Sequence, residues 1–226
     1  MGSQQRARND LASVRRRHVR WRRRSLHFSG EYRADFLTDR AIRFMKEKRR
    51  KDRPFLLVVS YLAVHHQNDS DLFVPPKYAY TYKHPWVPQD LRPLPETWPS
   101  QLPGYYGCVK GIDDAVETLL ASLKKQGIDQ DTIVLFTSDH ACHFRTRNAE
   151  YKRSPHESSI HITLIVQGPG FDRAMEIQEL VGQVDFAPTL LEAGRSGGSS
   201  FDARSKCVAS AIAHEGLARR SVYRGQ

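Results

Sequence analysis

The sequence lacks the features of a membrane protein, a secreted precursor and a disulfide-rich domain. No run of about 18 apolar residues occurs, so no segment is expected to span a membrane. The arginine-rich first 24 residues lack the apolar core of a secretory signal. The sequence as written therefore predicts no export, as for a cytoplasmic protein, and leaves the true location open. Cys108, Cys142 and Cys207 are widely spaced without a CxxC pair, which argues against a disulfide framework or a zinc–cysteine site.

Acidic residues are also scarce at the N-terminal end. Residues 1–53 hold 18 Lys/Arg against 6 Asp/Glu, whereas residues 54–226 hold 17 against 19. The net charge of +10 therefore belongs to one end of the chain and not to its body. The arginine triplets at 15–17 and 22–24 could contact phosphates or an acidic membrane. The alternative interpretation is a disordered leader.

The spacing of apolar residues predicts an α/β domain. Its elements, in order, are a helix ending near Arg50, a buried strand at 55–61, a long proline-rich loop at 64–103, a helix at 105–126, strands at 132–137 and 160–166, and a helix beginning at Asp185. The first strand is a continuous apolar run, which is typical of a central parallel strand buried on both faces. This order of elements favours a mostly parallel sheet flanked by helices.

Three segments are expected along the chain. Residues 1–28 form a basic leader without a stable apolar period. Residues 29–194 form the partial α/β domain. Residues 195–226 begin rich in glycine and serine and form a weakly structured tail.

Candidate ligands follow the second predicted strand. In an open α/β sheet, ligands gather beyond the carboxyl ends of the strands. Asp139 and His140 stand there and offer a carboxylate and an imidazole at adjacent positions. Such a pair suits Ca²⁺, Mg²⁺, Mn²⁺ or zinc, although two ligands are too few to hold an ion. The alternative is an aspartate that caps the next turn beside a surface histidine.

Two further places are ambiguous from the residues alone. His65 and His66 follow the first predicted strand and could protonate a leaving group or bind an anion. They could equally be polar residues where a strand meets solvent. Lys152, in the loop after the second strand, could bind substrate or be a solvated lysine.

Taken together, these residues resemble one family, the sulfatases of the alkaline-phosphatase superfamily, including arylsulfatases and phosphonate monoester hydrolases. The resemblance covers roughly residues 30–194 and rests on an ordered set of features. These are the strand and turn from Thr132 to His140, Lys152 with Glu157 five residues later, the Gly168-Pro169-Gly170 turn, the strand followed by His65, the tyrosines and aspartates at 105–106 and 113–114, and the helix start at 184–191.

The resemblance implies metal-dependent hydrolysis of sulfate esters. Asp139 and His140 match two ligands of the divalent metal, with Ca²⁺ the first expectation and Mn²⁺ or Mg²⁺ the alternatives. His65 matches the histidine near the leaving-group oxygen, and the neighbouring His66 is the less favoured match. Lys152 matches a lysine that binds sulfate. The implied partner is a small sulfate ester or a sulfated glycan, and the ester itself is left unidentified.

The sequence also departs from the family's pattern. The family's nucleophile is a formylglycine made within a C-x-P-S-R or S-x-P-S-R motif, and neither motif occurs here. Ala141 replaces the usual glycine after the turn that carries Asp139 and His140, where its Cβ would strain the backbone if φ is positive. His161 and Thr163 replace the usual arginine and proline. We therefore expect a truncated fragment that is weakly active or inactive.

Two other functions stay open. The chain could be a non-catalytic module that binds a metal or an oxyanion. It could also bind nucleic acid through its basic leader, although nucleic acid is the less favoured partner.

Overall fold

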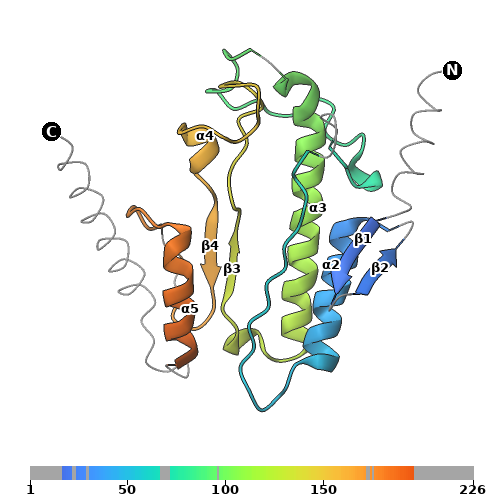
Figure 1. Cartoon of the computed structure of the whole chain (residues 1–226), viewed down its shortest axis with the longest axis vertical. Coiled ribbons are helices and arrows are strands. Elements are labelled where there is room, and N and C mark those ends of the chain that lie inside the picture. Colours follow the sequence, from blue (N-terminus) through green and yellow to red (C-terminus); the bar gives the residue numbers. More distant parts are fainter. Residues whose placement is uncertain are drawn as a thin grey trace. The chain divides into compact units, whose positions relative to one another are not determined.

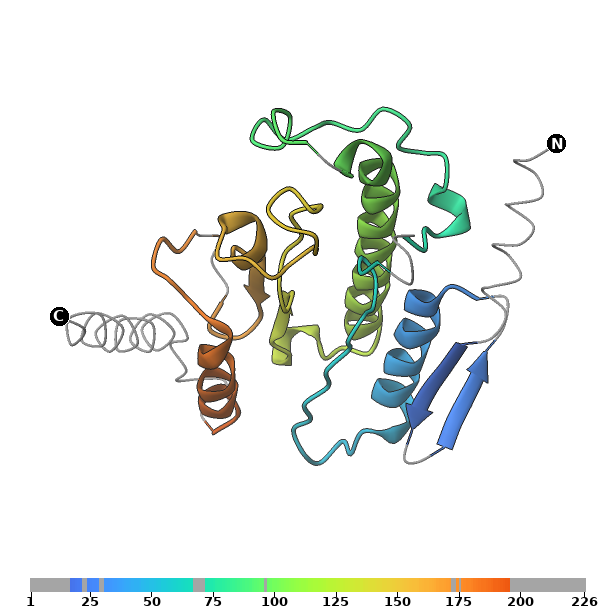
Figure 2. The same cartoon turned by 45° about the horizontal axis from the view of Figure 1, so that its top comes forward.

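The computed structural model describes residues 17–21, 24–28, 31–66, 72–95, 97–171, 174 and 176–195 (Figure 1 and, in a second view, Figure 2). The chain divides into two compact units, Met1–Ser122 and Leu123–Gln226. The predicted tail at 195–226 lies outside the described residues apart from its first position. Among the described helices, none combines the length and apolar character needed to cross a membrane.

The first unit begins with a hairpin. Strand β1 (Arg17–Trp21) pairs antiparallel with β2 (Arg24–Phe28), and Arg17 lies opposite Phe28. We expected no ordered element here because residues 1–28 show no sustained apolar period. An isolated two-stranded hairpin is marginally stable in water at best. The segment boundaries themselves stay a prediction.

Helix α2 (Arg33–Arg43) confirms the predicted first helix and continues as a π-helical turn at Phe44–Lys48. Its buried residues share one face: Ala34, Thr38, Ala41 and Met45. The Thr38 hydroxyl donates to the Ala34 carbonyl at 2.8 Å and shares a hydrogen bond of 2.9 Å with the Tyr61 hydroxyl. This contact ties the segment after the helix back onto the buried face of α2.

The segment at 55–61 differs from the prediction of a strand buried on both faces. It is extended but pairs with no strand among the described residues. Leu56 and Val58 are 73% and 78% exposed, while the alternate positions are half-buried. The prediction was wrong because an apolar run indicates a tendency to be buried, whereas burial itself depends on neighbouring strands.

Helix α3 (Trp98–Lys125) is the longest of the described elements and begins seven residues before the predicted start. Its Gly104, Gly107 and Gly111 lie on the side met by the segment around Val74 and Pro75. Lys77 and Tyr78, in the 3₁₀ turn η2 (Pro76–Tyr78), both hydrogen-bond to Asp114 of α3. The absence of side chains at these glycines lets the proline-rich loop lie directly on the helix.

Substituting Gly111 with alanine tests this close approach. A Cβ at Gly111 would lie 2.6 Å from Cγ of Pro75, a fully buried ring that cannot rotate away. We expect Gly111→Ala to lower the free energy of unfolding by about 1–2 kcal/mol, as overpacking outweighs the better helix propensity of alanine. Urea denaturation measures the change. Gly194→Ala is the control, because nothing lies within 4 Å of that Cβ, and an equal loss in both variants would contradict the packing argument.

In the second unit, strand β3 (Val134–Thr137) pairs with β4 (Leu164–Gln167), with Val134 opposite Gln167. The pairing is antiparallel, so the prediction that 132–137 and 160–166 run parallel was wrong. A parallel pair needs a long crossover that returns the chain to the starting end. Here the chain turns back through a loop containing only the short helix α4 (Glu157–Ile160) and enters β4 from the end where β3 finished.

Helix α5 (Phe186–Arg195) follows the 3₁₀ turn η4 (Gln183–Asp185) and confirms the predicted helix start near Asp185. An apolar pocket between the sheet and this helix shows which face α5 covers. It is lined from the sheet by Leu135, Leu164 and Val166 and from the helix by Phe186 and Leu190, among others. This small core supports the loop that carries the candidate ligands.

Candidate active site

The metal turn, defined here as Ser138-Asp139-His140, follows directly after β3. The Asp139 side chain is 83% exposed and that of His140 is 29% exposed. Asp139 Oδ2 and His140 Nε2 lie 3.4 Å apart. Neighbouring ligand atoms on an octahedral ion with bonds of about 2.3–2.4 Å are separated by about 3.3 Å. The two atoms are therefore close enough to bind one ion together.

The hydrogen bonds of His140 set which ring nitrogen faces the carboxylate. His140 Nδ1 is 2.9 Å from the Ala141 carbonyl oxygen, which can only accept a hydrogen bond. Nδ1 therefore carries the proton, and in the neutral ring Nε2 keeps its lone pair. A histidine that donates one N–H to a carbonyl and offers the other nitrogen is arranged as a metal ligand.

Two side chains donate hydrogen bonds to the backbone of the metal turn. The Ser138 hydroxyl donates to the His140 carbonyl at 2.7 Å. The Gln183 amide donates to the carbonyls of Ser138 at 3.0 Å and Asp139 at 2.9 Å. Gln183 itself is held by the start of α5, where the buried Asp185 carboxylate accepts from the Gly182 N–H at 2.8 Å. Sequence reasoning noted the helix start but missed Gln183, because an exposed glutamine carries no pattern of its own.

The predicted strain at Ala141 is absent. Among the described residues, the non-glycine positions with positive φ are Phe144 at 50° and Arg145 at 62°. The alanine at 141 therefore fits its backbone, and its N–H donates to the Ser159 carbonyl at 2.9 Å. The positive φ values lie three and four residues further along the chain.

The segment carrying Lys152 lies beside the segment that follows the metal turn. The His143 N–H donates to the Tyr151 carbonyl at 2.9 Å, and the Arg145 guanidinium lies 4.6 Å from the centre of the Tyr151 ring. The Asn148 amide donates to the Arg153 carbonyl at 2.7 Å. Lys152 is therefore in a segment joined to the metal turn's own loop, although its role as a sulfate ligand stays a prediction.

Sequence reasoning also missed His143. Its side chain is 1% exposed, and neither ring nitrogen has a hydrogen-bond partner among the described residues. Burial, first of all, lowers the pKa of this imidazole, and the nearby charges of His156 and Arg147 lower it further. The protonated form of His143 is thus disfavoured in the folded chain.

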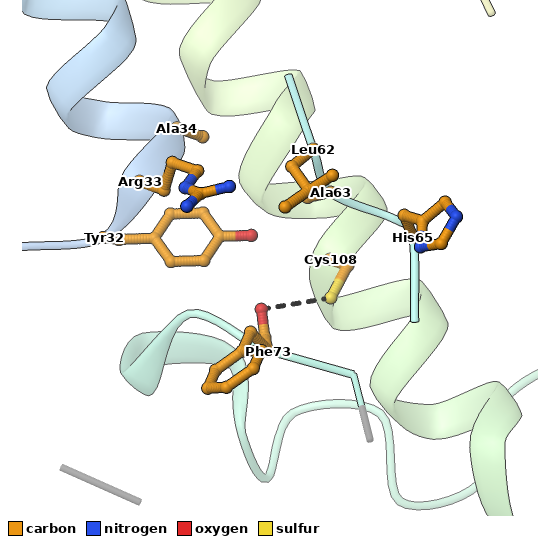
Figure 3. Close-up of a pocket in the computed structure, with 8 residues that line it drawn as sticks. All are labelled: Tyr32, Arg33, Ala34, Leu62, Ala63, His65, Phe73 and Cys108. Carbon is orange, nitrogen blue, oxygen red and sulfur yellow. Dashed lines mark hydrogen bonds between the residues drawn. The ribbon is translucent and has the colours of Figure 1, made fainter. Parts of the chain in front are cut away.

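His65 and His66 belong to the first unit, whereas Asp139, His140 and Lys152 belong to the second. His65 Nδ1 donates to the His66 carbonyl at 2.5 Å. His65 also lines a small pocket with Tyr32, Leu62 and Cys108, among others (Figure 3). The expected convergence of Asp139, His140, Lys152 and His65 at the carboxyl end of the sheet stays a prediction.

Cys108, in the same pocket, is no substitute for the missing nucleophile. Its thiol is buried and donates to the Phe73 carbonyl at 3.4 Å (Figure 3). Burial raises its pKa to about 12. A thiol with that pKa holds very little thiolate at neutral pH, and the thiolate is the reactive form.

The described residues fit a divalent metal only in part. They contain no group of three or more His, Cys, Asp or Glu side chains arranged to hold an ion. Asp139 and His140 therefore supply two ligands, a third or less of a coordination sphere. A hard cation such as Ca²⁺ needs about six or more oxygen ligands, so the rest would come from water, substrate or other protein groups.

Comparison with known proteins assigns the family. The model of the Sulfatase family matches residues 3–195, which is most of the chain. The chain belongs to the sulfatase family. The match starts within the arginine-rich segment at 1–28, well before the resemblance at 30–194 begins.

Curated relatives agree with this assignment. The chain is 28% identical to the uncharacterized sulfatase YdeN of Escherichia coli over 72% of its own length and 27% of the relative's. It is 26% identical to the extracellular sulfatase SULF-1 homolog of Drosophila melanogaster, over 74% and 17% of the two lengths. The ulvan-active sulfatase of Formosa agariphila is 27% identical over 72% and 32%. The chain thus spans a third or less of these relatives.

Solved structures confirm the fold. The structure named BT33494S-sulf, from work on glycosaminoglycan metabolism in Bacteroides thetaiotaomicron, matches with a TM-score of 0.69 and 24% identity, over 82% of this chain and 40% of that one. The Bacteroides fragilis protein yidJ, described as a sulfatase, matches with a TM-score of 0.67 and 21% identity, over 86% and 46%. The predicted class, a partial α/β domain of alkaline-phosphatase type, is confirmed.

Proposed function

We propose that this chain carries the metal- and sulfate-binding side of a sulfatase active site, which serves the hydrolysis of sulfuric esters. The observation that supports this most directly is the metal turn. The proton on His140 Nδ1 leaves Nε2 as a ligand atom, and that atom lies 3.4 Å from a carboxylate oxygen of Asp139. A surface histidine beside a capping aspartate would not require this arrangement.

The proposed roles follow from the charge that develops in the reaction. Sulfuryl transfer places negative charge on the peripheral oxygens of sulfate and on the departing oxygen. A divalent ion at Asp139 and His140, with Ca²⁺ first and Mn²⁺ or Mg²⁺ as alternatives, would stabilise the peripheral charge. Lys152 would bind the same sulfate as a cation. His65 would protonate the departing oxygen, and His66 would contact the substrate beside it.

The missing element is the nucleophile. No C-x-P-S-R or S-x-P-S-R motif occurs among the 226 residues, and the buried Cys108 thiol does not replace it. We therefore propose that this chain alone binds metal and oxyanion weakly and turns over little or no ester. The same observation favours a second candidate, a module that binds a metal or an oxyanion without catalysis. Both share one binding site and differ in turnover.

The substrate class we propose is a sulfated carbohydrate. The relatives include a sulfatase named for ulvan, and one matching structure comes from work on glycosaminoglycans. Those names describe the other proteins, and we extend the sugar sulfate to this chain as a proposal.

Metal binding tests the proposed site directly. Mn²⁺ added to the purified chain should lose its free-ion electron paramagnetic resonance signal on binding. We expect Asp139→Asn to weaken the affinity by at least about tenfold, because loss of even a supporting group at a metal site costs 10–100-fold. The control is Asp131→Asn, which removes an exposed carboxylate from the same unit. Equal affinities in the wild type and Asp139→Asn would refute the metal assignment.

A second prediction concerns Gln183, which touches no ligand atom. Because its amide holds the carbonyls of Ser138 and Asp139, Gln183→Ala should loosen the metal turn. We expect roughly tenfold weaker Mn²⁺ binding with both candidate ligands intact. Gln183→Glu distinguishes the loss of the donated hydrogen bonds from the loss of side-chain bulk, since it keeps the side-chain length but removes the donating NH₂ group. Full affinity in both variants would show that the turn holds its shape without Gln183.

A further inference from the structure

We propose that the loop between the metal turn and α4 forms a second anion-binding subsite, centred on Arg147 and Arg145. It would select sulfated sugars that carry another sulfate or carboxylate near the ester to be cleaved. The proposal rests on the proposed function, because the subsite is defined by its position beside the sulfate site.

Charge singles out this loop. Residues 143–156 contain four Arg/Lys and one Glu, whereas the rest of 123–195 contains four Arg/Lys and nine Asp/Glu. The loop is therefore positively charged, whereas the rest of residues 123–195 is negatively charged. The proposed metal site and Lys152 would engage one sulfate, and the charges of Arg145, Arg147 and Arg153 lie outside that role.

The backbone of the loop fixes these cations in place. Residues 143–148 run beside 151–153, joined by the hydrogen bond from His143 to Tyr151 and the one from Asn148 to Arg153. Arg145 adopts a left-handed backbone conformation that side chains rarely take, at φ 62°, and lies against the Tyr151 ring. Such strained positions cost about 1–3 kcal/mol and persist where the surrounding structure holds them.

The three arginines of the loop differ in the contacts that they make. Arg153 pairs with Glu150 at 3.2 Å, which partly neutralises it. Arg145 presents its guanidinium over an aromatic face, an arrangement that keeps the charge and fixes its direction. Arg147 is exposed and belongs to the run 143–148 that is joined to residues 151–153 by hydrogen bonds.

A guanidinium suits the proposed ligand. Its planar fork of donors matches the oxygens of sulfate and carboxylate in a bidentate geometry, which an ammonium does not provide. A sugar held by Lys152 through its reacting sulfate would place a second anion within the same loop. A monosulfated sugar would gain little from these arginines.

Ligand-observed NMR titration of the full chain tests this proposal with a disulfated disaccharide and its monosulfated counterpart. We expect the wild type to prefer the disulfated sugar by about tenfold, the gain of one charge-assisted hydrogen bond. Arg147→Gln should lose most of that preference, and Arg147→Lys should keep part of it. Lys124→Gln removes an exposed cation from the same unit and should leave the preference unchanged.

Each outcome decides the matter. Unchanged preference in Arg147→Gln, or an equal loss for both sugars, would overturn the second subsite. If Arg147→Gln weakens the binding of a short single-stranded oligonucleotide as much as it weakens the binding of the disulfated sugar, the loop is an unselective polyanion surface. That result would overturn the sugar assignment. Asp139→Asn distinguishes the underlying proposal. If the metal site is wrong, Mn²⁺ binding is unaffected by that change, whereas the Arg147 effect can still be measured with the two sugars.

Discussion

The purified chain is expected to hydrolyse 4-nitrophenyl sulfate at a rate roughly 10⁶-fold below that of an enzyme with an intact nucleophile. The reason lies in the sequence, which contains no motif for the formylglycine nucleophile of the family. His65, Lys152 and the metal turn can polarise a sulfate ester, but none of them can form the covalent sulfate intermediate. The metal should also bind weakly, because two protein ligands do not complete its coordination.

The assay follows release of nitrophenol with added Ca²⁺ or Mn²⁺, and compares the chain with Lys152→Ala and with Lys124→Ala as an exposed control. We expect all three to remain roughly 10⁶-fold below the turnover of an enzyme with an intact nucleophile. Turnover of about 1 to 10³ per second that vanishes only in Lys152→Ala would contradict the prediction. It would mean that an unrecognised residue supplies the nucleophile.

The helices could be predicted from the sequence because their information is local. The apolar spacing around α2 and along α3 repeats with the period of a helix, so both were located. The start of α3 was missed because Pro99 and Pro103 suggested a loop. Pro99 lies in the first turn, where its missing N–H has no partner in any case, whereas Pro103 lies inside the helix.

The strands depended on information that is not local. The run at 55–61 predicted burial, but the exposed Leu56 and Val58 show that burial requires neighbouring strands. The direction of the β3–β4 pair depended on the route of the chain between them. That route is set by the loop contacts of Ala141 and His143, which no pattern of residue types reveals.

Some residues of the candidate site could likewise be predicted from the sequence, and others could not. Asp139 and His140 could be found because they follow a strand and match a family pattern. Gln183 could not, since its importance lies in two hydrogen bonds to a turn 44 and 45 residues away in sequence. His143 could not, since a single histidine in a polar loop gives no sign of being 1% exposed.

The buried His143 leads to the other large expected effect, a loss of stability in acid. Its pKa is lowered in the folded chain, chiefly by burial, from the ordinary value of 6.5. Above pH 6.5 the imidazole is neutral in both the folded and the unfolded chain and contributes no pH dependence. As the pH falls below 6.5, the unfolded chain binds a proton that the folded chain does not. The free energy of unfolding then falls, until the folded pKa is reached, by at most about 1.4 kcal/mol per pH unit.

His143→Phe isolates this contribution, because phenylalanine fills a similar volume and neither titrates nor buries ring nitrogens without partners. Urea denaturation at pH 7.5, 6.0 and 5.0 should show the variant losing less stability than the wild type, with the difference growing as the pH falls and never exceeding about 1.4 kcal/mol per pH unit below 6.5. His161→Gln serves as the control, since it removes an exposed histidine whose ion pair with Glu157 is worth at most about 1 kcal/mol. If His143→Phe and the wild type lose stability in parallel between pH 7.5 and 5.0, the imidazole is not held neutral by burial. Its proton would then be accommodated by the loop that links the metal turn to the basic residues around Arg147.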